Sequence, residues 1–128
     1  MHGIIFFYIQ KFADEATSGK TTWLKLRETV SVSNNRYLPN EVYPDGDAVK
    51  LLQKIADTCG ETLPSLIERF GEFLAPHLIK VAGQHIDPAW RTLDLIENTE
   101  EIIHKMVRTA NPGAEPPVLE TVRHSPNE

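Results

Sequence analysis

A histidine in a helix-forming segment is the residue of this sequence best suited to chemistry. His104 lies beside Ile103 and Val107, at the edge of an apolar stripe with helical spacing. An imidazole can ligate iron through one ring nitrogen while the other nitrogen donates a hydrogen bond. The commoner interpretation of such a histidine is an ordinary half-buried or surface residue. Taken alone, the residue does not decide between these two interpretations.

Acidic residues come just before this histidine in the chain. They are Asp94, Glu97, Glu100 and Glu101. One interpretation is acid–base chemistry by a His104–Glu100 pair; the other is an exposed face with favourable negative charge near a helix N-terminus. Because no nucleophile or cofactor motif accompanies the pair, the sequence does not favour an enzyme.

Several other kinds of site are excluded by the sequence. It contains no P-loop, GxGxxG, HExxH or nucleophile-elbow motif. Its five histidines never stand three or four positions apart, which excludes a zinc pair on one helix. Cys59 is the single cysteine, so no intrachain disulfide can form, and we expect a reducing, cytoplasmic compartment.

Charge and hydropathy restrict the partners. The net charge of −5 argues against nucleic-acid binding, which depends on clustered lysine and arginine. The longest apolar run, Ile4–Ile9, is far shorter than the roughly 20 residues that a membrane-spanning helix needs. We therefore expect neither nucleic acid nor a membrane as a partner.

Apolar periodicity predicts a mainly α-helical fold. The expected helices cover residues 2–17, 21–30, 45–59 and 62–82. A last helical region is expected to begin at Asp87-Pro88, and its main helix to cover residues 99–110. The run Ile4–Ile9 taken alone also suits a buried strand, but the helical pattern continues well beyond it. Residues 31–43 are polar and are predicted to form a loop. Pro76 is expected to kink or interrupt the fourth helix.

Single residues decide some of the expected helix ends and faces. Asp45 or Asp47 is expected to cap the third helix, and Val49 to lie in its buried stripe. Asn98 followed by Glu101 resembles a capping box, so Asn98 is expected to begin the last helix.

The end of the chain differs from the rest in composition. Residues 111–128 contain four prolines, and only Pro117–Val122 has the composition of a short strand. The predicted organisation is therefore a helical domain over residues 1–110. Residues 111–128 follow as a proline-rich tail or as the start of a sheet-containing part.

The segment Arg91–Arg108 resembles the signature helix of heme–nitric-oxide/oxygen-binding (H-NOX) domains. In that family this helix carries the proximal histidine, and a turn ending in proline lies about thirteen residues further on. His104 and Pro117 keep this spacing. Three further segments also resemble the family, so that the resemblance covers the whole chain: Met1–Ile5, Tyr37–Asp45 and Phe70–Ala75.

The resemblance implies a heme b (iron protoporphyrin IX) with His104 as the single protein ligand and an open position for a diatomic gas. Apolar residues would line the distal side, namely Ile5, Ile9, Leu74, Ala75 and Leu78. O₂-binding members place hydrogen-bond donors over the gas, whereas Ile9 and Leu74 occupy the matching positions here. A pocket without donors does not stabilise bound O₂, so nitric oxide is the expected ligand.

The resemblance also implies a sensor that regulates a separate signalling protein, such as a histidine kinase or a diguanylate cyclase. Family members continue into a sheet-rich subdomain whose Tyr-x-Ser-x-Arg motif holds the heme propionates. The chain is therefore expected to be the helical portion of an H-NOX fold, without most of the C-terminal α/β subdomain. The alternative is a heme-free helical module that uses an exposed apolar face for protein interaction.

Overall fold

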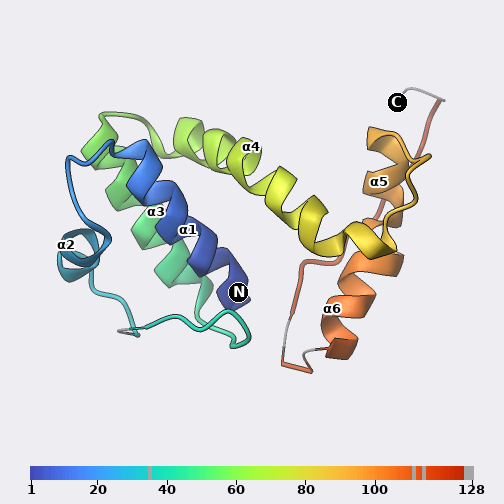
Figure 1. Ribbon diagram of the computed structural model, residues 1–128, viewed down its shortest axis with the longest axis horizontal. Coiled ribbons are helices and arrows are strands. Elements are labelled where there is room, and N and C mark those ends of the chain that lie inside the picture. The colour runs from blue at the N-terminus through green and yellow to red at the C-terminus, as the bar shows by residue number, and fades with distance from the viewer. Residues whose placement is uncertain (35, 111, 114, 126–128) are drawn as a thin grey trace. The chain divides into compact units, whose positions relative to one another are not determined.

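The computed structural model describes residues 1–34, 36–110, 112–113 and 115–125. It is mainly helical, as predicted (Figure 1). The α-helices are α1 (Gly3–Ala16), α2 (Trp23–Glu28), α3 (Asp45–Cys59), α4 (Leu63–Ala82), α5 (Thr92–Asn98) and α6 (Lys105–Ala110). A 3₁₀ turn, η1 (Gly83–His85), follows α4, and a π-helical turn, η2 (Thr99–His104), joins α5 to α6. The chain forms two compact units, Met1–Pro76 and His77–Glu128.

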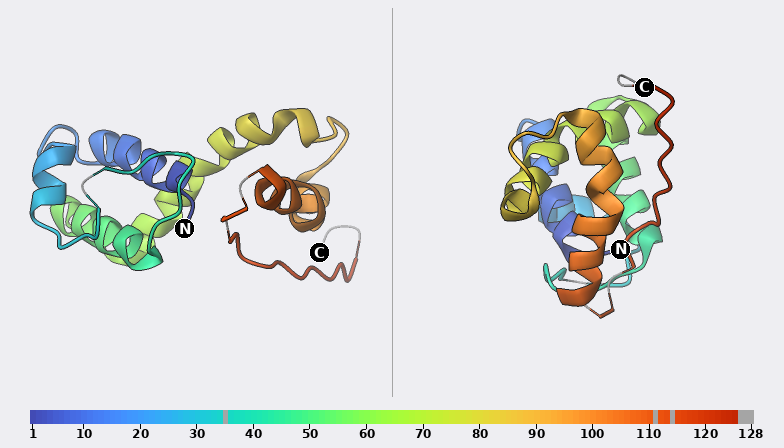
Figure 2. Two further views of the ribbon diagram at one scale, coloured as in Figure 1. Left: turned by 90° about the horizontal axis from the view of Figure 1, so that it is seen from below. Right: turned by 90° about the vertical axis from the view of Figure 1, so that its right-hand side faces the viewer.

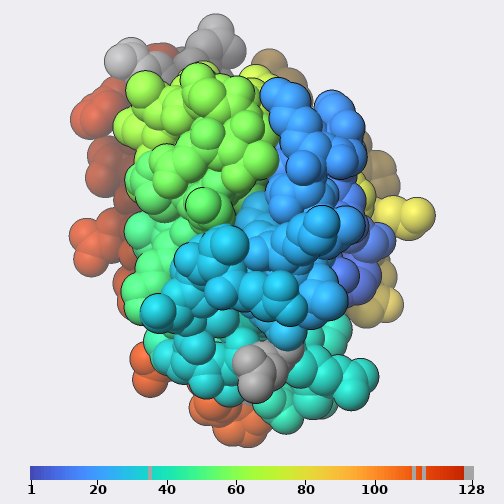
Figure 3. Space-filling view, turned by 90° about the vertical axis from the view of Figure 1, so that its left-hand side faces the viewer, coloured from blue at the N-terminus to red at the C-terminus, as the bar shows by residue number. Residues whose placement is uncertain are grey.

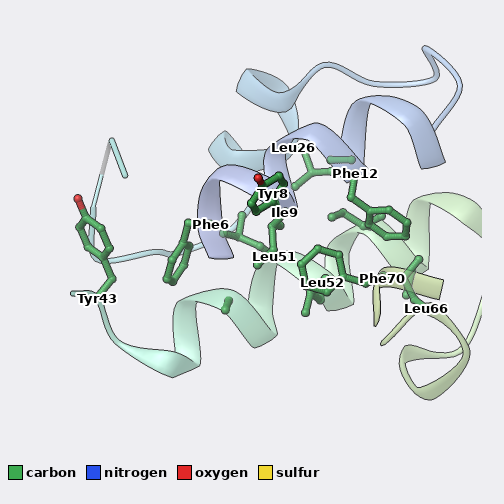
Figure 4. Close-up of a cluster of buried hydrophobic side chains, with 14 residues drawn as sticks. Phe6, Tyr8, Ile9, Phe12, Leu26, Tyr43, Leu51, Leu52, Leu66 and Phe70 are labelled. Atoms are coloured by element: carbon green, nitrogen blue, oxygen red, sulfur yellow. The ribbon is translucent and has the colours of Figure 1, made fainter. Parts of the chain in front are cut away.

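The first unit has a continuous apolar core. Helix α1 contacts both α2 and α3, and their apolar stripes meet one another and the first half of α4 (Figure 4). The largest apolar side chains that are fully buried are Phe6, Ile9, Leu26, Leu51, Ile55 and Leu66. Figure 3 shows α2 and the chain that follows it lying across α1 and α3. The helical prediction for residues 2–17 is thus confirmed, because Phe6 and Ile9 face the core as one helical stripe.

Helix α3 begins differently from the prediction. Pro44 occupies the N-cap position, so neither Asp45 nor Asp47 caps the helix. Val49 is 50% exposed, and Leu51 is buried instead. The reason is the helical phase, since a stripe that contains Asp47 and Leu51 places Val49 on the opposite face.

Helix α4 continues through Pro76 without interruption. The proline has no N–H for the carbonyl of Glu72, and this loss at one position did not end the helix. Apolar residues recur at helical spacing along α4, but two of them, Ile67 and Val81, are exposed.

The last helical stretch begins at Thr92, which is later than the expected region start at Asp87-Pro88 and earlier than the expected helix start at Asn98, so both predicted starts are wrong. The backbone N–H of Arg91 donates to Oδ2 of Asp94 at 2.9 Å, which gives this helix its capping interaction. Asn98 lies inside the stretch, where its side-chain amide donates to the carbonyl of Asp94. A helix that is already capped seven residues earlier needs no second start at Asn98.

The segment Pro117–Val122 is not a strand, which corrects the strand expected from its composition. Strands need a neighbouring backbone to pair with, and none of the described residues supplies one for this segment. It runs instead beside α5 and α6, as both views of Figure 2 show.

A buried carboxylate holds the loop before α3 in place. Asp47 is 2% exposed and accepts hydrogen bonds from the N–H and hydroxyl of Ser33 and from the hydroxyl of Tyr37. The ring of Tyr37 stacks on Phe6, with 4.2 Å between the centroids. Burial and the neighbouring Asp47 raise the pKa of Tyr37 above its ordinary range, so the phenol keeps its proton and remains a donor.

We expect Asp47→Asn to lower the free energy of unfolding by about 2 kcal/mol, because hydrogen bonds to a charged acceptor become bonds to a neutral one. Chemical denaturation monitored by circular dichroism measures the change. Asp14→Asn is the control, since Asp14 is exposed on α1. Equal stability of the two variants would contradict a structural role for Asp47.

Candidate functional site

His104 is the last residue of the π-helical turn η2, in the second unit. Such turns are rare and are often found at functional sites. The imidazole is 15% exposed, so it is neither locked in a core nor free in solvent. The prediction that this histidine lies in a helical segment is confirmed.

The position of the hydrogen on the neutral imidazole follows from the hydrogen-bond partner of Nδ1. Nδ1 of His104 lies 2.8 Å from Oε2 of Glu100. A carboxylate only accepts hydrogen bonds, so Nδ1 must carry the hydrogen. In the neutral imidazole the other nitrogen, Nε2, then has a free lone pair, and no described residue donates to it. This is the arrangement that a histidine ligand of a metal usually has.

Glu100 binds three groups at once. Its Oε1 accepts a hydrogen bond from Arg108 at 2.6 Å, and its Oε2 also accepts one from the backbone N–H of Leu119 at 3.2 Å. The hydrogen bond from His104, together with that from Arg108, lowers the pKa of Glu100 to about 2. Glu100 is therefore ionised at neutral pH.

Two other acidic residues, Asp94 and Glu97, hold the C-terminal segment, which comprises residues 115–125. Arg123 contacts Oδ1 of Asp94 and Oε1 of Glu97, each at 2.8 Å. The N–H of Arg91 and the guanidinium of Arg123 keep the pKa of Asp94 below its usual value. Three of the carboxylates noted in the sequence, Asp94, Glu97 and Glu100, are thus engaged in contacts within the second unit.

The residues expected on the distal side are distributed over both units. Ile9 is fully buried in the core of the first unit, and Ile5 and Leu74 pack against the same core. Ala75 is exposed in that unit. Leu78 and Pro117 belong to the second unit and are both exposed.

Two partners of the site could not have been found from the sequence. Arg108 and Leu119 reach Glu100 from eight and nineteen positions away. The contact between Glu100 and His104 has a signal, because residues four apart face each other on a helix. The N–H of Leu119 gives no such signal, since it depends on the path of the chain after α6.

The family model described as haem-NO-binding (HNOB) matches residues 2–128. The chain belongs to this family. H-NOX domains are heme-based gas sensors. A solved structure, an H-NOX protein from S. oneidensis in the Fe(II)NO ligation state, is similar with a TM-score of 0.83 and 21% identity. The match covers 99% of this chain and 69% of that chain. This likeness shows the H-NOX fold. No curated protein matches the chain.

The donor set of this H-NOX chain fits heme better than a bare metal ion. Among the described residues, no group of three or more His, Cys, Asp and Glu side chains could hold a metal ion. Heme brings four ring nitrogens of its own and needs only one axial ligand from the protein. A single histidine with an available Nε2 meets this need.

In the same described residues, no helix is long and apolar enough to cross a membrane.

Proposed function

We propose that the chain binds heme b through His104 as its only protein ligand and senses a diatomic gas, in particular nitric oxide. The observation that carries this proposal is the hydrogen bond from Nδ1 of His104 to Glu100, which leaves Nε2 available for iron. Membership of a family of heme-based gas sensors supports it.

Heme, when bound, would supply an iron atom that can bind the gas. The chain would contribute the side chains around the bound gas. Ile5, Ile9, Leu74, Ala75 and Leu78 are the proposed lining residues, and none of their side chains carries a hydrogen-bond donor. An environment without donors does not stabilise the polar bound form of O₂, whereas nitric oxide and carbon monoxide need no donor. The preference for nitric oxide rests on this composition.

We further propose that the domain acts in the cytoplasm on a separate signalling protein, such as a histidine kinase or a diguanylate cyclase. Pro117 would fix the direction of the chain after the His104 helix, because a proline and the residue before it have few backbone conformations. The segment that follows Pro117 then keeps a defined path past Glu100 and Asp94, to which Leu119 and Arg123 bind.

Heme uptake by the purified chain tests this function. Hemin is titrated into the protein, which is then reduced and exposed in separate samples to nitric oxide, carbon monoxide and air. We expect a sharp Soret band that shifts with the first two gases and not with O₂. Absence of a Soret band at saturating hemin would refute the proposal, and a stable complex with O₂ would refute the gas preference.

A second candidate is a heme-free interaction module. It is favoured by the exposure of Val118 and Val122, which are each 74% exposed on the C-terminal segment. The hemin titration separates the two functions, because only the sensor takes up heme through a histidine.

A further inference from the structure

One carboxylate joins the candidate iron ligand to the C-terminal segment. Oε2 of Glu100 accepts both from Nδ1 of His104 and from the backbone N–H of Leu119. Its other oxygen is held by Arg108, which prevents the carboxylate from rotating freely. The side chain of Glu100 is 18% exposed, so these contacts have limited competition from water.

We propose that Glu100 is the positioning residue of His104 and also its link to Leu119. This inference rests on the proposed function, since it concerns the ligand that would hold iron. Glu100 keeps the hydrogen on Nδ1, fixes the plane of the imidazole and connects the ring directly to the backbone that leaves the helix.

The geometry supports positioning rather than general stabilisation of the helix. The carboxylate is four residues before His104, so the two side chains project from the same face of the turn. Glu101 is the next residue and is exposed on another face. Glu100 and Glu101 therefore carry the same charge and lie in the same helical turn, but only Glu100 contacts the imidazole.

The link to Leu119 gives the C-terminal segment a way to follow the ligand. The segment has a second attachment, because Arg123 binds Asp94 and Glu97 at the other end of the helical stretch. A shift of His104 would disturb the contact at Leu119 and leave the one at Arg123 in place. The attachment at Glu100 is thus the one that can respond to a movement of His104.

The first experiment uses the heme-free chain. Long-range ¹H–¹⁵N correlation spectra at a pH where His104 is neutral report which ring nitrogen carries the hydrogen. We expect the Nδ1–H form in the wild type and a shift toward the Nε2–H form in Glu100→Ala. Glu100→Gln should keep the Nδ1–H form, because its side-chain carbonyl still accepts. Amide exchange at Leu119 should accelerate roughly fivefold in Glu100→Ala.

The second experiment uses the heme-loaded chain. Loss of the hydrogen-bonded carboxylate makes the imidazole a weaker donor to iron, so Glu100→Ala should weaken heme binding roughly 10–100-fold. It should also lower the Fe–His stretching frequency in resonance Raman spectra and raise the reduction potential. A loss of folding stability alone would change neither the Fe–His stretching frequency nor the reduction potential.

Glu101→Ala is the matched control, and it should resemble the wild type in every measurement. An unchanged tautomer and unchanged heme affinity in Glu100→Ala would overturn the positioning role while leaving the proposed function intact. Equal effects of Glu100→Ala and Glu101→Ala would also overturn it, because they would indicate helix charge rather than contact. A wild-type chain that takes up no heme would overturn both proposals.

Discussion

The variant His104→Gly is expected to lose the Soret band of the heme-loaded protein and to regain it when free imidazole is added. His104 is the proposed single ligand, so its removal leaves the iron without any protein bond. Changes to a residue that only supports a metal ligand already cost about 10–100-fold in affinity. We therefore expect heme affinity to fall by more than about 100-fold, measured by hemin titration at the Soret maximum.

Imidazole restores the band because it supplies the missing nitrogen without the tether to the helix. Glycine within the helix costs about 1 kcal/mol of stability, which circular dichroism will show to be small enough for folding. The control is His124→Gly, which changes an exposed histidine in the same unit. Retention of the wild-type spectrum by His104→Gly, or its loss in the control alone, would place the ligand elsewhere.

The sequence located the helix of His104 because the signals involved are local. Apolar periodicity predicts a helix directly, and the glutamate four positions before the histidine predicts a contact on one face. The third helix was expected to end at residue 59, and Gly60 ends α3 there with a left-handed φ of 74°. Each of these features depends on residues within one or two turns of each other.

Features that depend on chain segments far apart were not predictable. Asp47 looked like a helix cap, yet it is buried because Ser33 and Tyr37 bring their donors to it from the preceding loop. Asn98 looked like a cap, but Asp94 already accepts from the N–H of Arg91, seven residues before Asn98. Pro117–Val122 has strand-like composition, and it remains unpaired in the described chain. In each case tertiary contacts or a competing local contact decided the outcome.

Gly3→Ala is expected to be strongly destabilising. A Cβ at this position would overlap the backbone carbonyl oxygen of Leu38 and would lie 3.0 Å from Cε2 of Tyr43. Neither neighbour can move easily, since the hydroxyl of Tyr43 accepts from the N–H of Leu38 and donates to Glu41. Overpacking of this kind usually costs 1–3 kcal/mol, and contact with fixed backbone lies at the upper end. We expect a loss of about 3 kcal/mol in the free energy of unfolding, measured by chemical denaturation.

The matched control is Gly71→Ala in α4, where an added Cβ meets nothing within 4 Å. Alanine has the higher helix propensity, so this variant should be more stable than the wild type by about 0.5–1 kcal/mol. The same chemical change thus has opposite expected signs at two helical positions. Similar stabilities of the two variants would show that the start of α1 can move away from the loop at Leu38. A loss at Gly3 alone would show that this loop is held rigidly against α1, the helix that carries Ile5 and Ile9.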